Sequence, residues 1–178
     1  QDFFEKNKSY SNLYKGIRHA KAGRNKLAEK AYKNVLSKDN ENVDALRLLG
    51  LLAFKNNNHD IAEQLLIKAI RLDPYFHLLW DNLAKVFRVQ NKLEDSKKAF
   101  ENLIKLDPSN NEAFVALGTI YNKLAQYKDG INSYKKALKL NDNNPRVYLS
   151  MGHALKTLGN RKECEDSYLK AIKLFPLS

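Results

Sequence analysis

The stretch Phe114-Val115-Ala116-Leu117-Gly118-Thr119-Ile120-Tyr121 decides how this chain folds. Its large residue, leucine, glycine and tyrosine recur at a spacing that puts all four on one face of a helix. A second apolar block, which contains Tyr134 and Ala137, follows after a short turn. Because a short turn forces two helices to lie antiparallel, we expect a helical hairpin over residues 111–144.

The same pattern returns every 34 residues along the chain. Its glycine position is occupied by Gly16, Gly50, Ala84, Gly118 and Gly152. The large residue four places earlier is Leu46, Trp80, Phe114 or Tyr148. Twelve places after the glycine stand Ala28, Ala62, Ser96, Gly130 and Cys164, and four places further Tyr32, Leu66, Phe100, Tyr134 and Tyr168. The period predicts five hairpins, at 9–42, 43–76, 77–110, 111–144 and 145–178, after an N-terminal extension of residues 1–8.

Each recurring position has a physical reason. Small residues let the two helix backbones of a hairpin approach closely, and the aromatic positions fill the remaining space between them. Pro74, Pro108 and Pro176 recur where the second helix should end, because proline cannot continue the helical hydrogen-bond ladder. We therefore expect ten antiparallel helices and no strands.

This pattern resembles the tetratricopeptide repeat (TPR), whose signature is W-x2-L-G-x2-Y, then A-x3-F, then P, on a 34-residue period. The third repeat carries Trp80, Leu83, Ala84 and Phe87 at these positions, and the resemblance extends over residues 9–178. It implies an all-α fold, a right-handed α-solenoid of five TPR helix-turn-helix hairpins. The first repeat departs most from the pattern, as expected of a capping repeat with one face in solvent.

The composition is that of a folded protein of 178 residues with a net charge of +11. That charge indicates either a surface for acidic partners or a compositional habit, since Lys outnumbers Arg, the residue favoured for carboxylate and phosphate forks. No run of about 18 apolar residues predicts a membrane span. The N-terminus shows no signal peptide, although a removed one stays an alternative because the chain does not begin with Met. A single cysteine suits a reducing compartment, so we expect a cytoplasmic protein without membrane association.

The residues give no positive reason to predict an enzyme. Every glycine falls in a repeat position or an inter-helix turn, so none is left for a phosphate-binding loop. The histidines lie in different repeats without the spacing of a metal site. Cys164 stands in a small-residue packing position, where we expect a buried structural thiol. We predict no catalytic residue, no metal and no cofactor.

The first helix of each repeat has a second face, formed by the second, fifth, ninth, twelfth and thirteenth residues of each repeat. In proteins of the resembled family this stripe lines a concave groove, so the resemblance implies a binding groove here. The stripe carries eight Lys or Arg and three acidic residues, which favours an acidic ligand. The candidate groove residues are Arg47, Leu51, Phe54, Lys55, Leu78, Asp81, Lys85, Arg88, Val89, Thr119, Asn122, Lys123, Arg146, His153 and Lys156.

Large apolar residues on this stripe indicate a contact surface. They are Leu51, Phe54, Leu78, Val89 and Val115, extended by Leu13 and Ile17 in the first repeat. The alternative is that these side chains pack within a tight superhelix. We predict a non-catalytic scaffold that binds a peptide or protein, with an acidic partner as one expectation.

Two groove chemistries known in the resembled family are not matched. The Lys/Asn/Lys/Arg clamp for a C-terminal carboxylate fails because Leu13 and Ile17 stand at its first two positions, and a frame one repeat later meets Leu51. Of the asparagine ladder in O-GlcNAc transferase repeats, only Asn82 is present.

A narrower resemblance offers a different context for the repeats. Residues 144–148 and 152–160 look like the last repeats before the catalytic domain of bacterial repeat-containing sulfotransferases, and 44–51 is similar to early repeats of that group and of bacterial repeat-bearing glycosyltransferases. This implies, as an alternative, the substrate-recruiting arm of a larger enzyme. A further alternative is a binder of an anionic polymer or nucleic acid, although the stripe lacks the Arg-and-aromatic platform used for single strands.

The last predicted helix, at about 162–174, carries an apolar face made of Tyr168, Ile172 and Leu174, with Phe175 just beyond. In earlier repeats the corresponding residues would pack on the next hairpin. Leaving such side chains in water forgoes roughly 1.5–3 kcal/mol each. We therefore expect either that the natural chain continues past Ser178 or that this end self-associates with another copy.

Overall fold

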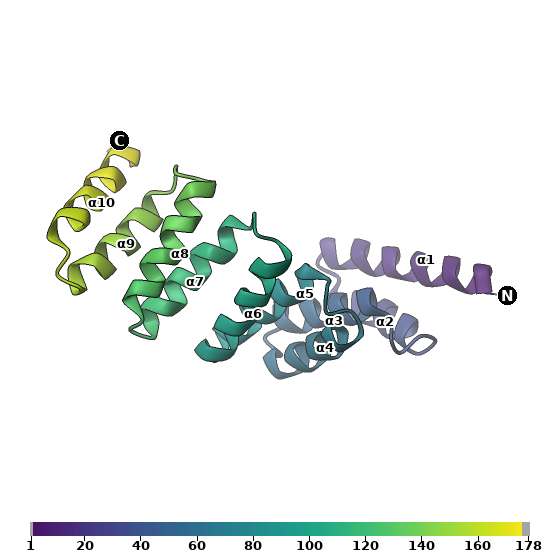
Figure 1. The fold of residues 1–178 in the computed structure, drawn as a ribbon. Coiled ribbons are helices and arrows are strands. Elements are labelled where there is room, and N and C mark those ends of the chain that lie inside the picture. Colours follow the sequence, from purple (N-terminus) through teal and green to yellow (C-terminus); the bar gives the residue numbers. More distant parts are fainter. Residues whose placement is uncertain (1, 176–178) are drawn as a thin grey trace. The chain divides into compact units, whose positions relative to one another are not determined.

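The computed structural model describes residues 2–175, with side chains from residue 10 onward. Ten α-helices make up the regular structure of these residues, and no strand occurs among them (Figure 1). The expectation of an all-helical chain is therefore confirmed for residues 2–175. The chain divides into two compact units, Gln1–Gln90 and Asn91–Ser178, each with a core of its own.

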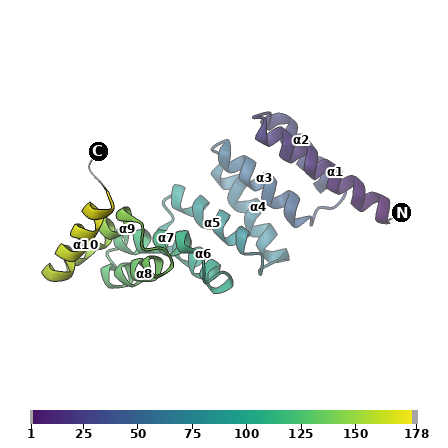
Figure 2. The ribbon, with the colours of Figure 1, turned by 90° about the horizontal axis from the view of Figure 1, so that it is seen from above.

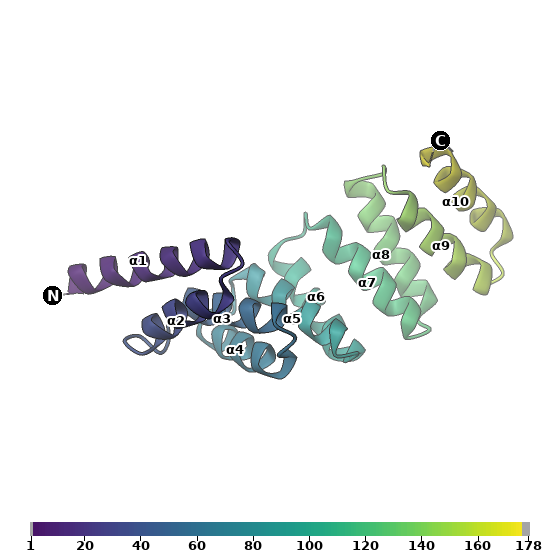
Figure 3. The same cartoon turned by 180° about the vertical axis from the view of Figure 1, so that it is seen from behind.

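The first unit is a series of helices in which successive members pack together. Its helices are α1 (Asp2–Lys21), α2 (Asn25–Leu36), α3 (Val43–Lys55), α4 (His59–Leu72) and α5 (His77–Val89). Each helix contacts the next, from α1 to α5. The first helix extends well beyond α2 (Figure 3), because residues 2–8, expected as an extension, form its first turns.

The core of the first unit follows the repeat positions. Ala28 and Tyr32 of α2 are almost fully buried, together with Val35 and Ala45. A Cβ atom on Gly16 would overlap the Tyr32 ring, so the glycine is what lets this ring pack closely against α1. Small and aromatic positions thus act as the paired packing elements that their periodicity predicts.

The second unit repeats the same arrangement. Its helices are α6 (Leu93–Leu106), α7 (Asn111–Lys123), α8 (Tyr127–Leu140), α9 (Pro145–Thr157) and α10 (Arg161–Leu174). Each helix contacts the next, and α7 to α10 lie in chain order toward the C-terminal end of the chain (Figure 2 and Figure 3). The boundary between the units falls between α5 and α6, inside the predicted repeat 77–110.

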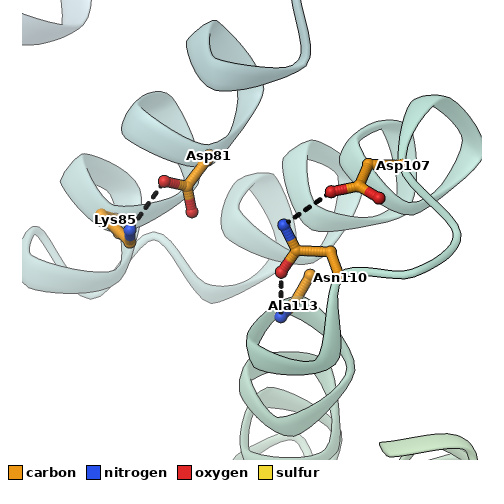
Figure 4. Close-up of polar contacts among 5 residues, drawn as sticks. All are labelled: Asp81, Lys85, Asp107, Asn110 and Ala113. Atoms are coloured by element: carbon orange, nitrogen blue, oxygen red, sulfur yellow. Dashed lines mark hydrogen bonds and ion pairs between the residues drawn. The ribbon is translucent and has the colours of Figure 1, made fainter. Parts of the chain in front are cut away.

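Asparagine side chains begin several of these helices. In α7, Asn110 Oδ1 accepts a hydrogen bond from the Ala113 backbone N–H at 3.0 Å, while Asn110 Nδ2 donates to Asp107 Oδ2 at 3.1 Å (Figure 4). Asn42 makes the same pair of bonds at the start of α3, to Ala45 and Asp39. Such caps satisfy backbone N–H groups that a helix start leaves unpaired, and they favour the start of the helix at these positions.

Candidate ligand-binding faces

First helices of neighbouring repeats touch one another within each unit. α1 contacts α3 and α3 contacts α5 in the first unit, and α7 contacts α9 in the second. Their stripe residues therefore form one continuous face per unit. The α1/α3/α5 face contains the candidates Arg47, Leu51, Phe54, Lys55, Leu78, Asp81, Lys85, Arg88 and Val89. The α7/α9 face contains Thr119, Asn122, Lys123, Arg146, His153 and Lys156.

The apolar candidates of the α1/α3/α5 face differ in exposure. Leu78 is 39% exposed and Val89 is 53% exposed. Leu51 and Phe54 are half-buried, and the Phe54 ring lies 5.4 Å from the His59 ring between their centroids. Among these candidates, the exposed apolar surface therefore comes mainly from α5.

Leu13 corrects the sequence interpretation. It was expected to extend the contact surface, but it is only 7% exposed and belongs to the core cluster with Ala28 and Tyr32. Ile17 is half-buried against the same cluster. The physical reason is that α1 packs on both α2 and α3, so this side of the helix is covered. For Leu13 the alternative of internal packing was the right one.

Two cations of the α1/α3/α5 face have partners inside the unit. The Arg47 guanidinium lies 3.5 Å from Asp44 Oδ1 and 5.5 Å from the centroid of the Phe76 ring, with only 18% of the side chain exposed. Lys85 Nζ lies 2.6 Å from Asp81 Oδ2 on the same helix (Figure 4). Their charges are therefore already balanced or screened before any ligand arrives.

Among the candidate cations of this face, Lys55 and Arg88 are the available ones. Both side chains are exposed. Neither takes part in any of the ion pairs found among residues 10–175. Each stands in the last turn of its helix, where a positive charge also interacts favourably with the helix dipole.

Two polar candidates of the α7/α9 face, Asn122 and Thr119, form hydrogen bonds that connect neighbouring helices. Asn122 Nδ2 donates to the Ser150 carbonyl at 3.3 Å and to the Tyr134 hydroxyl at 3.4 Å, and that hydroxyl donates to Thr119 Oγ1 at 3.4 Å. Burial raises the pKa of Tyr134, so the phenol stays a proton donor in this network. The network joins α7, α8 and α9.

Three cations of the α7/α9 face remain exposed. Lys123, Arg146 and Lys156 are solvent-facing, and none of them is in an ion pair with the side chains that the structure describes. His153 is exposed but its Nδ1 lies 3.2 Å from the Tyr168 hydroxyl. Leu149, a stripe residue left out of the candidates, adds an exposed apolar side chain beside them.

Beyond the two faces, the described residues offer few other functional groups. No group of three or more His, Cys, Asp or Glu side chains within them could hold a metal ion. The free thiol of Cys164 is buried, as its small-residue position predicted. No described helix combines the length and apolar character needed to cross a membrane.

One basic feature escaped the sequence interpretation. Lys15, Arg18, His19 and Arg24 line a cavity at the turn between α1 and α2. The signal that could have found it is simple, since residues 15–24 contain five basic side chains and no acidic one.

Family models and solved structures agree with the hairpin architecture. Two models described as tetratricopeptide repeat match residues 14–75 and residues 78–110 and 145–176, and a TPR repeat model matches 118–159. A comparison with curated proteins found no match.

The solved structures that match span nearly the whole chain. A crystal structure of MamA protein is 23% identical, with a TM-score of 0.88, and the match covers 96% of this chain and 97% of that one. A second MamA crystal structure is 25% identical, with a TM-score of 0.85 and coverage of 89% and 93%. YrrB, described as a TPR protein with an unusual peptide-binding site, is 14% identical, with a TM-score of 0.85 and coverage of 93% and 85%.

The helices, their paired small and aromatic positions and these matches point to one family. The predicted all-α class is confirmed, and α1–α4 and α7–α10 pair as the hairpins that a 34-residue period requires. The chain belongs to the tetratricopeptide-repeat family and is an all-α solenoid of TPR hairpins.

Proposed function

We propose that this chain is a non-catalytic scaffold that binds a peptide or protein on its α1/α3/α5 face. The observation that carries the proposal is the pairing of two kinds of surface on neighbouring helices. Lys55 and Arg88 are exposed and unpaired among the described side chains, and the apolar Leu78 and Val89 are exposed on α5. Apolar anchors beside polar groups are the usual composition of a recognition surface.

An acidic segment with apolar anchors fits this surface best. Lys85 is neutralised by Asp81, so the net positive charge of α5 comes from Arg88. Lys55 adds a second uncompensated charge from α3. The peptide-binding site in the description of YrrB, which shares the fold, supports a peptide as the kind of ligand. The recruiting arm of a larger sulfotransferase or glycosyltransferase stays a prediction.

The test uses labelled peptides with Leu and Phe anchors flanked by either Glu or Lys, added to the whole chain and followed by fluorescence anisotropy. We expect the Glu-flanked peptides to bind, and more weakly as salt is raised. The double variant Lys55→Glu with Arg88→Glu should weaken this binding about tenfold, the value for roughly 1.4 kcal/mol.

The matched control is Lys30→Glu with Lys68→Glu. These lysines are exposed on α2 and α4, away from the α1/α3/α5 face, and the control makes the same change in net charge. We expect it to alter binding by less than about twofold, because exposed charges beyond about 10 Å are screened by salt. An equal loss in both double variants, or no loss in the first, would place the contact elsewhere.

A second part of the proposal concerns self-association through α10. Leu169, Ile172 and Phe175 are 63%, 60% and 52% exposed. Tyr168 and Leu174, which were expected on the same exposed face, are half-buried. The Tyr168 ring packs against Gly152. Exposed large apolar side chains on and just after one helix are typical of contact surfaces, and another copy of the chain would bury them.

A further inference from the structure

A strongly basic cavity lies at the turn between α1 and α2, outside the candidate residues of the α1/α3/α5 face. Its volume is about 530 Å³, and it is lined by Lys15, Arg18, His19, Lys21, Ala22 and Arg24. All lining residues except Ala22 are basic; His19 is half-buried and the other four are exposed. The volume falls in the range of small-ligand sites, roughly 300–1,000 Å³.

The helix dipole does not account for this accumulation of charge. A positive side chain in the last turn of a helix is favourable, and α3, α5, α7 and α9 each have one there. In α1 the last turn has three, Arg18, His19 and Lys21. The last turn of α1 therefore holds two more basic residues than the last turn of any other first helix.

Capping does not account for it either. The backbone N–H groups of Ala22, Gly23 and Arg24 already donate to the last carbonyls of α1, with N–O distances of 3.1, 3.1 and 2.9 Å. Gly23 adopts a left-handed φ of 72°, the conformation that closes a helix end in this way. The basic side chains are therefore not needed to satisfy backbone groups at this end.

Among the described side chains, no acid forms an ion pair with the cluster. Residues 15–24 contain no Asp or Glu. None of the ion pairs within the described part of the chain includes Lys15, Arg18, His19, Lys21 or Arg24. Like charges held this close repel one another, and a bound multivalent anion would relieve that repulsion.

We propose that this cavity binds a phosphate group carried by a phosphorylated side chain of a peptide partner. Arginine is scarce in this chain, yet two of its arginines, Arg18 and Arg24, line this one cavity. A guanidinium group binds phosphate oxygens in pairs, and a phosphorylated side chain presents three such oxygens.

The lining favours a phosphopeptide over other phosphate carriers. A single-stranded nucleic acid needs aromatic side chains on which its bases stack, and the cavity lining has none apart from the His19 ring. A lipid surface needs apolar side chains that enter the membrane interface, and Ala22 is the one apolar residue of the lining.

The decisive experiment compares a fluorescein-labelled peptide carrying one phosphoserine with its unphosphorylated counterpart, bound to the whole chain at constant ionic strength. We expect the phosphopeptide to bind at least about tenfold more tightly, as charge-assisted hydrogen bonds allow. Inorganic phosphate should compete with it, whereas chloride at equal ionic strength should not. The double variant Arg18→Gln with Arg24→Gln should lose this preference.

The matched control is Lys26→Gln with Lys30→Gln, which removes two exposed charges from α2 without touching the cavity lining. We expect it to keep the phosphate preference within about twofold. Should the arginine variant lose helical content by circular dichroism, Arg18→Lys with Arg24→Lys keeps the charge and removes the forks. That variant should weaken phosphopeptide binding by several-fold.

Three outcomes would overturn the proposal. Equal affinity for the two peptides would show that the phosphate group contributes nothing to binding. Equal losses of phosphopeptide affinity in the two Gln variants would show that only the net charge of the chain matters. Tighter binding of labelled oligouridine or of anionic phosphatidylserine vesicles, sensitive to the arginine variant, would assign the cavity to nucleic acid or membrane. The variant Lys55→Glu with Arg88→Glu should keep the preference for the phosphopeptide. The experiment can therefore contradict phosphate binding at the cavity without contradicting peptide binding on the α1/α3/α5 face, and the reverse.

Discussion

Gly118 sets how closely α7 can approach the aromatic ring that α8 presents to it. A Cβ atom at this position would lie 2.5 Å from Cε1 of Tyr134, far inside contact distance. The ring cannot simply move aside, because its hydroxyl is hydrogen-bonded to Thr119 and Asn122. The packing of this hairpin therefore depends on the absence of one methyl group.

Gly118→Ala should destabilise the protein. Overpacking a well-filled site costs about 1–3 kcal/mol, and the better helix propensity of alanine returns about 1 kcal/mol. We expect a net loss of up to about 2 kcal/mol in the free energy of unfolding, measured by urea denaturation.

Gly50→Ala is the matched control for this substitution. Gly50 occupies the equivalent position in α3, but its nearest neighbour would be Leu66 Cγ at 3.2 Å, a contact that a flexible side chain can relieve. The two effects should nearly cancel at Gly50. If both alanine variants changed stability equally, close packing against tyrosine would not be the reason for glycine at 118.

Asparagine caps act at the level of the whole helix. Asn42, Asn110 and Asn144 each accept a hydrogen bond from a backbone N–H of the first turn, in α3, α7 and α9. The equivalent position before α5 is Phe76, which makes no such bond and instead lies under the Arg47 guanidinium. At the start of α5, a cation–π contact thus takes the position that a side-chain cap has in α3, α7 and α9.

Asn110→Ala should lower the free energy of unfolding by about 0.5–2 kcal/mol, because it leaves the Ala113 N–H in the first turn of α7 without its side-chain acceptor and removes the hydrogen bond from Asn110 Nδ2 to Asp107. Thermal unfolding followed by circular dichroism would measure the loss. Asn132→Ala, an exposed position inside α8, should be neutral or slightly stabilising. A cap that contributes nothing would leave the two variants equal.

At the scale of the whole molecule, the exposed face of α10 bears on assembly. If another copy of the chain covers Leu169, Ile172 and Phe175, sedimentation should show association that increases with concentration. Ile172→Lys should shift the distribution toward the monomer, because it would bury an unpaired charge in the contact.

Ile61→Lys provides the control for that experiment. Ile61 is 52% exposed on α4, close to the 60% of Ile172, and lies outside the α10 face. It should leave association unchanged. A wild-type chain that stays monomeric at moderate concentration, or an equal effect of both lysine variants, would rule out α10 as the contact.

The predicted all-helical class is confirmed for residues 2–175, but the repeat positions do not tell which site residues are available to a ligand. Among the predicted cations, Lys55 and Arg88 are exposed and unpaired among the described side chains, whereas Arg47 and Lys85 have partners within the unit. A sequence stripe reports which side of a helix a residue is on. It does not report which neighbouring group has already bound that residue.

What the sequence determined by itself is local: the hairpins, their turns and the pairing of small with aromatic positions. These follow from spacing along one helix and between two helices joined by a short turn. Tertiary structure alone decided that Leu13 is buried, that Asn122 joins three helices, and that Lys15 and Arg24 line one cavity. Each of these features depends on side chains that come together through packing between helices or across a turn. The periodicity of the sequence does not encode the distances between such side chains.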